Sequence, residues 1–452
     1  MEQSSNNQYS YSVRFILVGL LLLVVGMVFG MIGAFQYVIP GALKEFLSFE
    51  KIRPMHVSSV VFWIISGSIG CVLTYLQEHS EKKLYSQMLI RIQWYILTSS
   101  ILIILISYCF GIFGGREYWE FHPFLAIPIV LGWILFLVNV IKSIGSIRNQ
   151  PVYVWMWLTG VVFFLFTFCE SYLWIFPYFR NNVVNDMTVQ WKSYGSMVGS
   201  WNMLIYGSSI FLIQKISKDK NYAHSRIAFL LYFTGLFNLM FNWGHHIYTL
   251  PTHGYVKHIS YAVSMTELFI IGRILFQWKN TVSSAQKFFN STAYRLILAA
   301  DGWIFLTLLL AIAMSIPAIN IYTHGTHVTV AHTMGATIGI NSFLLLAIAF
   351  DILKGTDEKV QSQKKSFMIG YWMANCALFI FWLTLILAGA MKAQWQLSIN
   401  PILYKDMMLQ LHPYFVVFLL SGVCLFVGIS IMILPLVKTS AYRSFYQKQR
   451  SK

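Results

Sequence analysis

The sequence predicts an all-α integral membrane protein, built as a bundle of twelve transmembrane helices. Of its 452 residues, 57% are hydrophobic and only 11% are charged, whereas about a quarter of the residues in a soluble domain carry a charge. Twelve apolar runs of about 20 residues, the length that crosses a bilayer, follow one another along the chain. No segment between them is long enough for a separate soluble domain, so we expect residues 1–452 to form one transmembrane domain.

The first of these runs is too long for the apolar core of a cleavable signal peptide, so we expect it to remain as the first helix. Short loops connect the helices. The expected ranges are 13–37, 56–76, 88–113, 123–142, 152–177, 192–213, 226–248, 256–277, 293–315, 327–351, 366–391 and 413–436.

The distribution of positive charge predicts the orientation of the chain in a lipid bilayer. A net charge of +16 would suit a protein that binds nucleic acid, but most of the Lys and Arg residues fall in alternate loops and in the C-terminal tail. This asymmetry follows the positive-inside rule. We therefore expect a multi-pass protein with both termini in the cytoplasm and no nucleic-acid partner.

Four histidines from three predicted helices fall at one depth, in the outer third of the membrane. His56 begins the second helix, His245 and His246 end the seventh, and His332 lies about 8 Å into the tenth. Ionisable groups inside a membrane are costly, and those that are present are functional by default. Their shared depth predicts a layer of metal or haem ligands.

The spacing of these residues restricts how they could bind a metal. Adjacent His245 and His246 diverge by about 100° on an ideal helix, so they can share one metal only where the helix end is unwound, as Gly244 permits. His332 and Met334 project about 200° apart. Their helix can therefore offer one axial iron ligand on each face, since His and Met are both ordinary haem ligands.

These motifs resemble those of the catalytic subunit of the haem–copper oxidase and nitric oxide reductase superfamily. The resemblance is closest to cytochrome c-dependent nitric oxide reductases and to subunit I of C-type oxidases, and it covers all twelve helices in order. It implies the twelve-helix fold of haem–copper oxidase subunit I. It also implies a location in a bacterial inner membrane, with the active site toward the periplasm.

Three motifs carry the implied cofactor ligands. The sequence RPMH at 53–56 implies that His56 is an axial ligand of a low-spin haem b. The sequence GHH at 244–246 implies a non-haem iron or copper held by the histidine pair. The sequence YTHGT at 322–326, followed by His332, implies that His332 is the proximal ligand of a high-spin haem b, with His324 also in the cofactor-binding region.

The resemblance also implies roles for acidic and basic side chains. The sequence GREYWE at 115–120 is similar to an outer loop whose acids lie near a calcium ion and the haem propionates. It implies that Arg53 and Arg116 lie at the haems, that Glu117 lies at calcium, and that Glu120 is a candidate proton donor. Glu267 stands at the place of a reductase glutamate near the active site.

The chain departs from the family at two ligand positions. Helix 10 of the family carries His-x-His, whereas Met334 stands at the second position here, so His56 and Met334 are expected to ligate the low-spin haem. Helix 6 of the family supplies a third histidine to the non-haem metal. Its place is taken by Tyr194 in the reductase spacing, or by Gly195 in the oxidase spacing.

Two imidazoles alone make a poor iron or copper site, so four alternatives follow for the non-haem metal. Tyr194 ligates it, water and Glu267 complete the ligand set, the metal is a different one, or it is missing.

The expected activity depends on a third departure. C-type oxidases carry a tyrosine six residues before the histidine pair, which acts as a donor in oxygen cleavage, and Leu239 stands at that position here. We therefore predict a respiratory oxidoreductase of denitrification, the catalytic subunit of a nitric oxide reductase-like complex that reduces NO to N2O. The chain has no C-x-x-C-H motif for covalent haem. The implied partner is thus a membrane-anchored c-type cytochrome.

Three other functions remain open at this point. They are a C-type-like terminal oxidase that reduces oxygen to water, unusual NO chemistry such as dismutation, and a haem electron carrier or sensor that lacks the second metal. A transporter is disfavoured, because transporters usually show two related halves, whereas the polar groups here gather in one outer layer and are mainly histidines.

Overall fold

The computed structural model describes residues 11–268, 292–354 and 364–450. Helices make up the regular structure of these residues, and the single β-bridge, between Arg116 and Trp119, stands outside any strand. Eleven helices are long and apolar enough to cross a membrane. The predicted class, an all-α membrane bundle, is therefore confirmed.

The eleven helices correspond to eleven of the twelve predicted runs. The remaining run, 256–277, is described only in part: α9 spans Gly254–Met265, and residues 269–277 lie outside the described ranges. Three helices begin well before their predicted starts, namely α2 (Phe49–Ser80), α7 (Val183–Ser217) and α16 (Tyr404–Arg450). His56 therefore lies two turns inside α2, and not at its first residue.

The early start of α7 has a local cause. The side chain of Asn182 accepts hydrogen bonds from the backbone N–H groups of Val184 and Asn185, at 3.0 and 3.1 Å. An asparagine cap of this kind satisfies amide groups that the first helical turn leaves unpaired. A search for apolar runs alone misses such polar first turns.

The chain folds into two compact units. Unit 1 comprises residues 1–145, 348–379 and 419–452, and unit 2 comprises residues 146–347 and 380–418. Unit 1 contains α1 (Tyr11–Val38), α2, α3 (Gln87–Cys109), η1 (Pro123–Leu125) and α4 (Ala126–Ile144), with most of α14 (Phe343–Lys354), the first part of α15 (Lys364–Gln396) and the second part of α16.

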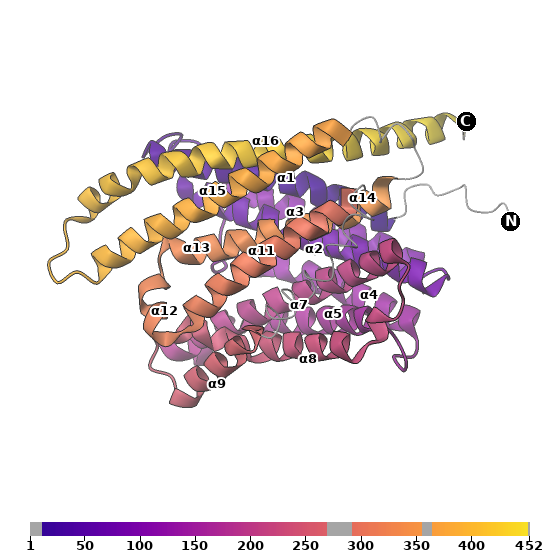
Figure 1. The fold of residues 1–452 in the computed structure, drawn as a ribbon, viewed down its shortest axis with the longest axis horizontal. Helices are drawn as coiled ribbons and strands as arrows, with labels where there is room; N and C mark the ends of the chain where they lie inside the picture. Colours follow the sequence, from indigo (N-terminus) through magenta and orange to yellow (C-terminus); the bar gives the residue numbers. More distant parts are fainter. Residues whose placement is uncertain (1–10, 269–291, 355–363, 451–452) are drawn as a thin grey trace. The chain divides into compact units, whose positions relative to one another are not determined.

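Unit 2 contains the remaining elements (Figure 1). They are α5 (Val152–Glu170), η2 (Leu173–Ile175), α6 (Pro177–Arg180), α7, η3 (Tyr222–His224), α8 (Arg226–Phe241), η4 (Asn242–Ile247), α9, α11 (Thr292–Ser315), α12 (Pro317–Thr323), α13 (His327–Met334) and η5 (Gly335–Ser342), with the second part of α15 and the first part of α16.

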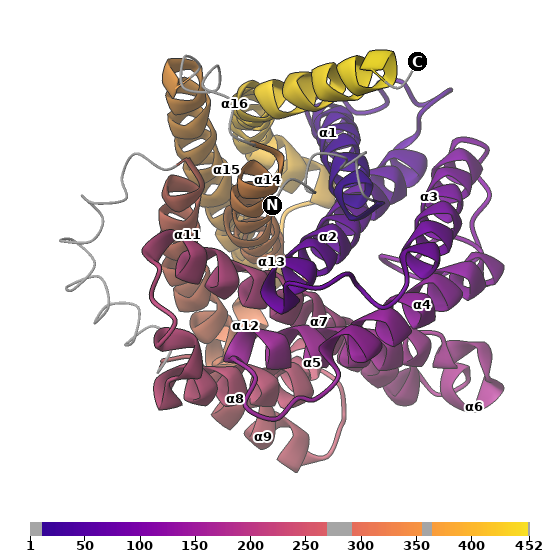
Figure 2. The same cartoon turned by 90° about the vertical axis from the view of Figure 1, so that its right-hand side faces the viewer.

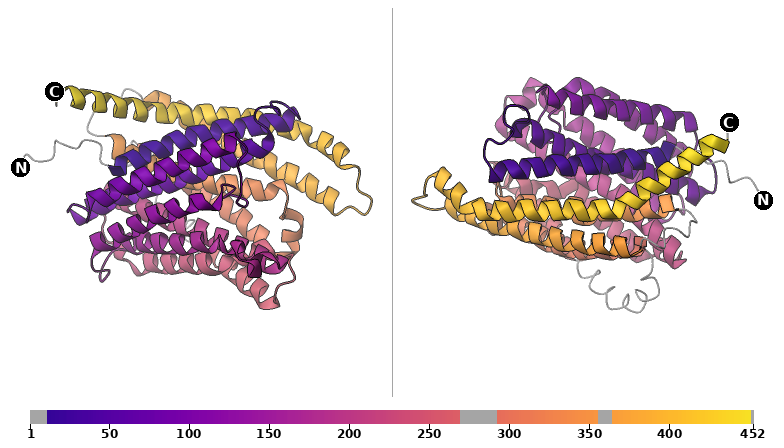
Figure 3. Two further views of the ribbon diagram at one scale, coloured as in Figure 1. Left: turned by 180° about the vertical axis from the view of Figure 1, so that it is seen from behind. Right: turned by 90° about the horizontal axis from the view of Figure 1, so that it is seen from above.

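In unit 1, glycines bring α1 and α2 close together along most of their length (Figure 2). A Cβ atom at Gly19 would lie 2.8 Å from the ring of Trp63, and one at Gly30 would lie 2.8 Å from the ring of His56. Small residues allow such close approach between helices in a membrane. The same device acts between α15 and α16 (Figure 3), where a Cβ at Gly370 would lie 2.7 Å from the carbonyl oxygen of Gly428.

In unit 2, α13 continues into a π-helical segment, η5, before α14 begins. The hydroxyl of Ser342 donates to the carbonyl oxygen of Thr337, five residues earlier, at 2.8 Å. Gly339 faces Trp303 of α11, where a Cβ would overlap the indole ring. A π-helical turn inside an α-helix is rare and often marks a functional site, and here it directly follows His332 and Met334.

The close packing of α1 on α2 can be tested at Gly70. A Cβ at this position would lie 2.6 Å from the carbonyl oxygen of Ser12, a backbone atom that cannot swing aside. We expect Gly70→Ala to lower the free energy of unfolding by about 1–3 kcal/mol, the usual cost of overpacking, measured by denaturant titration in detergent.

The control is Gly254→Ala, at a position where a Cβ would meet no atom within 4 Å. We expect this variant to unfold within about 0.5 kcal/mol of the wild type. Equal losses in the two variants would contradict the proposed packing.

Candidate functional site

The adjacent imidazoles of His245 and His246 lie at the end of α8, where the helix tightens into the 3₁₀ segment η4. Their ring centroids are 4.2 Å apart, and the ring planes are tilted by 40°. A 3₁₀ helix turns neighbouring residues apart by about 120°, so rotation of the side chains is what brings the rings together. The helix end is therefore wound more tightly here, and not unwound as sharing of one metal was expected to require.

Two side chains in and just after α12 brace the backbone of this pair. The amide of Asn320 donates to the carbonyl oxygen of His245 at 3.2 Å and to that of Met314 at 2.9 Å. The Nε2 of His324 donates to the carbonyl oxygen of His246 at 3.1 Å. Buried carbonyl groups need such partners. His324 thus supports the pair through the backbone, with its Nε2 already engaged.

The side chain of Asn242 joins His245 to Glu267. Its Oδ1 accepts a hydrogen bond from Nδ1 of His245 at 2.8 Å, and another from the hydroxyl of Ser264. Its Nδ2 donates to Oε1 of Glu267 at 3.1 Å. Glu267 is therefore linked, through Asn242, to the Nδ1 side of His245.

α7 presents aromatic side chains to the histidine pair. The indole ring of Trp191 stacks on the imidazole of His246, with centroids 5.0 Å apart and an angle of 8° between the planes. Tyr194 lies three residues further along the same face of α7 and is 7% exposed. A Cβ at Gly195 would lie 2.9 Å from the Cβ of Trp243, so that position faces Trp243.

His332, on α13, completes a cluster of four histidines in unit 2. It lies against the backbone of Thr307 in α11, and it is close enough to His245 and His246 for their charges to interact. We call His245, His246, His324 and His332 the histidine cluster. In the described part of the chain, no three or more His, Cys, Asp or Glu side chains form a group that could hold a metal ion.

In unit 1, His56 is anchored to the backbone of α1. Its Nδ1 donates to the carbonyl oxygen of Gly26 at 2.7 Å, and its ring lies over Gly30. Because a carbonyl oxygen only accepts, Nδ1 carries the proton in this hydrogen bond. Met334, its expected partner ligand, lies in unit 2 at the end of α13, so the pairing of these two residues stays a prediction.

The guanidinium of Arg53 bridges both acids of the loop before α4. It forms ion pairs with Glu117 and with Glu120, the latter at 3.1 Å. The loop closes on itself, because the backbone groups of Arg116 and Trp119 bond to each other at 3.2 and 2.9 Å. A calcium ion at Glu117 would have to share that carboxylate with Arg53.

Burial is the main influence on the pKa values of Glu120 and Tyr118 in this loop. It raises the pKa of Glu120 above its ordinary value of 4.5, and it outweighs the opposing effects of the backbone amides and of Arg53. Burial likewise raises the pKa of Tyr118, to about 12. The Glu120 side chain is 13% exposed, whereas that of Glu117 is 39% exposed.

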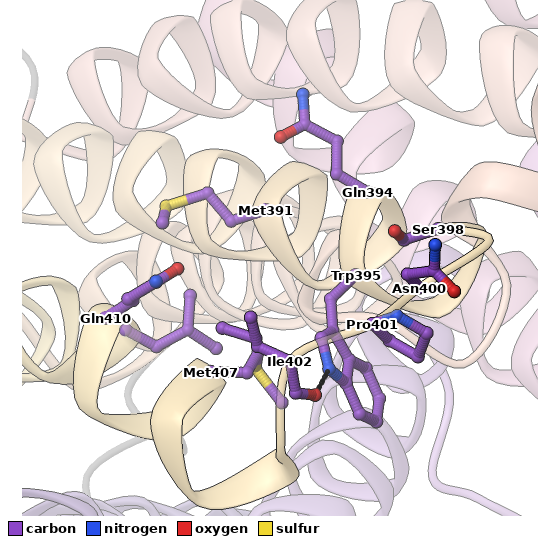
Figure 4. A pocket seen from close by; sticks show the side chains of 10 residues that line it. Met391, Gln394, Trp395, Ser398, Asn400, Pro401, Ile402, Met407 and Gln410 are labelled. Atoms are coloured by element: carbon purple, nitrogen blue, oxygen red, sulfur yellow. Dashed lines mark hydrogen bonds between the residues drawn. The ribbon is translucent and has the colours of Figure 1, made fainter.

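A pocket lies away from the histidine cluster, at the turn between α15 and α16 (Figure 4). The indole N–H of Trp395 donates to the carbonyl oxygen of Ile402 at 2.7 Å and closes this turn. The lining residues include Met391, Gln394, Asn400 and Gln410, and none of them is acidic, basic or a histidine. The pocket offers no group for acid–base or metal chemistry.

Sequence reasoning missed Asn242, Trp191 and Asn320, which hold or cover the histidine pair. Asn242 and Asn320 follow from no known ligand motif, although an amide side chain three residues before His245, within a predicted membrane helix, is a usable signal. A second usable signal is the spacing i, i+4, i+7 of Ser260, Ser264 and Glu267, because residues so spaced share one helix face.

The fold and these residues together define a polytopic helical membrane protein with a histidine-rich centre. The chain matches the family described as Cytochrome C and Quinol oxidase polypeptide I over residues 10–424. It belongs to this family, within the haem–copper oxidase and nitric oxide reductase superfamily.

Individual relatives are distant and carry two different activities in their names. The chain is 23% identical over 407 residues to a nitric oxide reductase subunit of Stutzerimonas stutzeri, and the match covers 82% of each protein. It is 19% identical to the cbb3-type cytochrome c oxidase subunit CcoN1 of the same organism, over 96% of this chain and 95% of that one. A cytochrome c oxidase subunit 1 homolog of Agrobacterium tumefaciens (strain T37) is 22% identical, over 90% and 79%.

The fold is similar to that of a solved haem–copper terminal oxidase dimer. The TM-score is 0.72 at 15% identity, and the match covers 96% of this chain and 84% of that chain. This likeness confirms the subunit I architecture expected from the sequence.

The charge balance of the outer loop predicts a pH dependence of stability. Because the pKa of Glu120 is raised in the folded protein, its contribution is fully present below pH 4.5 and is lost as the pH rises through the folded value. We expect the melting temperature of the wild type to fall over this interval, and that of Glu120→Gln to fall less.

Glu117→Gln is the matched control, because it removes the other partner of Arg53 and leaves Glu120 in place. We expect it to keep the pH dependence of the wild type. Identical melting profiles of Glu120→Gln and the wild type between pH 4 and pH 7 would contradict the assignment to Glu120.

Proposed function

We propose that the chain is the catalytic subunit of a nitric oxide reductase-like complex in a bacterial inner membrane, which reduces NO to N2O with electrons from a cytochrome c. The observation that carries this choice is Leu239, at the position of the tyrosine that C-type oxidases use in oxygen cleavage. Leu239 is 3% exposed and packs on Gly199 of α7. The relative that is named as a nitric oxide reductase supports the same choice.

The residues present suit the cofactors that this function requires. Metal-binding histidines usually donate their second ring N–H to a backbone carbonyl or a side-chain oxygen, which fixes the tautomer and leaves the other nitrogen free. His56 does so with Gly26, and His245 does so with Asn242. We propose that His56 and Met334 hold a low-spin haem b, His332 a high-spin haem b, and His245 with His246 a non-haem iron or copper.

When bound, these groups would supply electron transfer and the redox chemistry on the gas. The chain's own residues orient the ligand side chains, shield the site from water and supply protons. Trp191 stacks on His246 and fixes the plane of its ring. The indole of Trp191 is an apolar neighbour of the pair, which suits a small uncharged substrate.

Protons are consumed in the reaction, because two molecules of NO, two electrons and two protons give one N2O and one water. Glu267 is our candidate proton donor beside the histidine pair, since it is 8% exposed and linked to the pair through Asn242. We propose Glu117 and Glu120 as donors nearer the outer surface. A proton held on a positioned carboxyl is the ordinary form of general acid catalysis.

Two sets of contacts bear on our proposal for the third ligand of the non-haem metal. Glu267 lies beyond the Nδ1 side of His245, so it is the weaker candidate for direct ligation. Tyr194 shares the α7 face of Trp191, which touches His246, and we propose Tyr194 or water for this place. The electron-donating partner is a membrane-anchored c-type cytochrome, because the chain carries no C-x-x-C-H motif.

Reduction of oxygen to water is the second candidate function. It is favoured by the relatives named as oxidase subunit 1 and as CcoN1, and by the fold of the terminal oxidase. Such an enzyme would need an electron and proton donor other than the missing tyrosine.

The two functions are separated by gas consumption in the purified complex with its cytochrome partner. We expect loss of NO at an electrode and formation of N2O in the headspace, with His246→Ala lowering the rate by more than about 100-fold. His253→Ala is the control, because its ring stacks on Tyr255 outside the histidine cluster. Consumption of oxygen without any consumption of NO would contradict the proposal.

The proposed ligation by Met334 predicts the potential of the low-spin haem. A His/Met pair raises the reduction potential of a haem relative to two histidines. Met334→His should therefore lower the midpoint of the low-spin haem in an optical redox titration and leave the haem content unchanged. An unchanged midpoint would show that Met334 is not a ligand.

A further inference from the structure

Asn242 occupies the point where three hydrogen-bonding groups of unit 2 converge. Donors from His245 and Ser264 meet its Oδ1, while its Nδ2 meets an acceptor on Glu267. Its backbone carbonyl is bonded as well, to the hydroxyl of Ser260 at 2.8 Å. Every polar group of its side chain is thus used within the protein.

The approach of η4 to α9 makes this convergence possible. A Cβ at Gly244 would lie 2.8 Å from the Cβ of Ser260 and 3.2 Å from the carbonyl oxygen of Val256, so only glycine allows the two segments to come this close. Ser260, Ser264 and Glu267 follow the i, i+4, i+7 spacing of one helix face. That face therefore presents two hydroxyls and one carboxyl toward Asn242.

The carboxyl group sets the orientation of the amide. Glu267 Oε1 accepts the bond from Nδ2, and exchanging the two ends of the amide would place oxygen against oxygen there. It would also bring Nδ2 to the hydroxyl of Ser264 and to Nδ1 of His245. With Oδ1 held on that side, Nδ1 of His245 must carry the proton, because an amide oxygen only accepts hydrogen bonds.

We propose that Asn242 is a positioning residue that fixes the tautomer of His245, so that its Nε2 faces the metal, and that holds Glu267 beside the pair. The inference rests on the proposed function, and it extends that function with a residue whose role no ligand motif predicts. The linkage is a carboxylate–amide–histidine chain, in which the amide takes the place of a direct carboxylate–histidine bond.

The two carboxyl oxygens of Glu267 differ in their hydrogen bonds. Its Oε2 is buried and has no hydrogen-bond partner among the described residues, while Oε1 is held by Asn242. The carboxyl is therefore oriented through one oxygen, and among the described residues the other has no hydrogen bond. This arrangement suits a group that receives and delivers a proton next to the site.

The test compares Asn242→Leu with Asn238→Leu in the purified complex. Asn238 lies one turn earlier, on α8, and its amide bonds to the hydroxyl of Thr266 at 3.1 Å and to the carbonyl oxygen of Thr234, so it is a matched half-buried amide with partners other than histidine. We expect Asn242→Leu to weaken non-haem metal binding by 10- to 100-fold, the usual effect of removing an outer partner of a metal-binding histidine. Chelator competition measures this affinity, and the EPR spectrum of the metal should change with it.

Two further variants test separately the bond from Asn242 to Glu267 and the bond from His245 to Asn242. Glu267→Gln keeps an oxygen that can accept from Asn242, so we expect metal affinity within a few-fold of the wild type and a loss of turnover. Asn242→Asp keeps the acceptor for His245 and should recover most of the affinity that Asn242→Leu loses. Haem content should be unchanged in all four variants. Wild-type affinity in Asn242→Leu, or an equal loss in Asn238→Leu, would overturn the proposal.

A measurement that needs no metal distinguishes failure of this proposal from failure of the proposed function. In a double-mutant cycle of Asn242→Leu and His245→Leu, the two shifts in melting temperature should be clearly non-additive, because the residues share one hydrogen bond. Additive shifts would overturn the link. A wild-type complex without non-haem metal but with non-additive shifts would refute the metal site and keep the link.

Discussion

Burial of an imidazole in a membrane protein favours a hydrogen bond to one ring nitrogen, and this requirement positions His56 in unit 1 and His245 in unit 2. Unpaired polar groups are costly in a medium without water. His56 meets the requirement with a helix carbonyl, at Gly26. That contact exists because α1 carries glycines where it crosses α2, so that a backbone oxygen comes within reach of an imidazole. The hydrogen bond that orients His56 thus depends on the close packing of α1 and α2.

In unit 2, the side chain of Asn242 meets the same requirement for His245. The histidine pair sits where α8 tightens into η4, and such helix ends leave carbonyl groups unpaired. Asn320 and His324 bond to the carbonyls of the pair, and Asn242 bonds to the ring of His245. These hydrogen bonds hold the segment in place without any bound group. Rigid support of this kind is what a metal-binding or catalytic residue requires.

The class of fold and most of the helices could be predicted, because a membrane requires long apolar runs. The starts of α2 and α7 could not be predicted, because their first turns contain polar residues and a search for apolar runs does not include them. The π segment after Met334 was also beyond prediction, because a bulge of this kind depends on contacts with Trp303 and Thr307 in another helix. Among the site residues, histidines were found by depth, whereas Trp191 and Asn242 act through contacts between elements distant in sequence. The pairing of His56 with Met334 and a calcium ion at Glu117 stay predictions.

The central question about the chemistry is whether His245 and His246 hold a metal without a third histidine. The indole of Trp191 in α7 stacks on His246, and Tyr194, at the place where a third imidazole is expected, follows three residues later in the same helix. Our account claims that this pair still holds a metal beside a haem on His332. Metal analysis of the purified complex, with haem measured as its pyridine complex, tests the claim most directly. The account predicts two haems b and one further iron or copper per chain, and two haems with no third metal would contradict it.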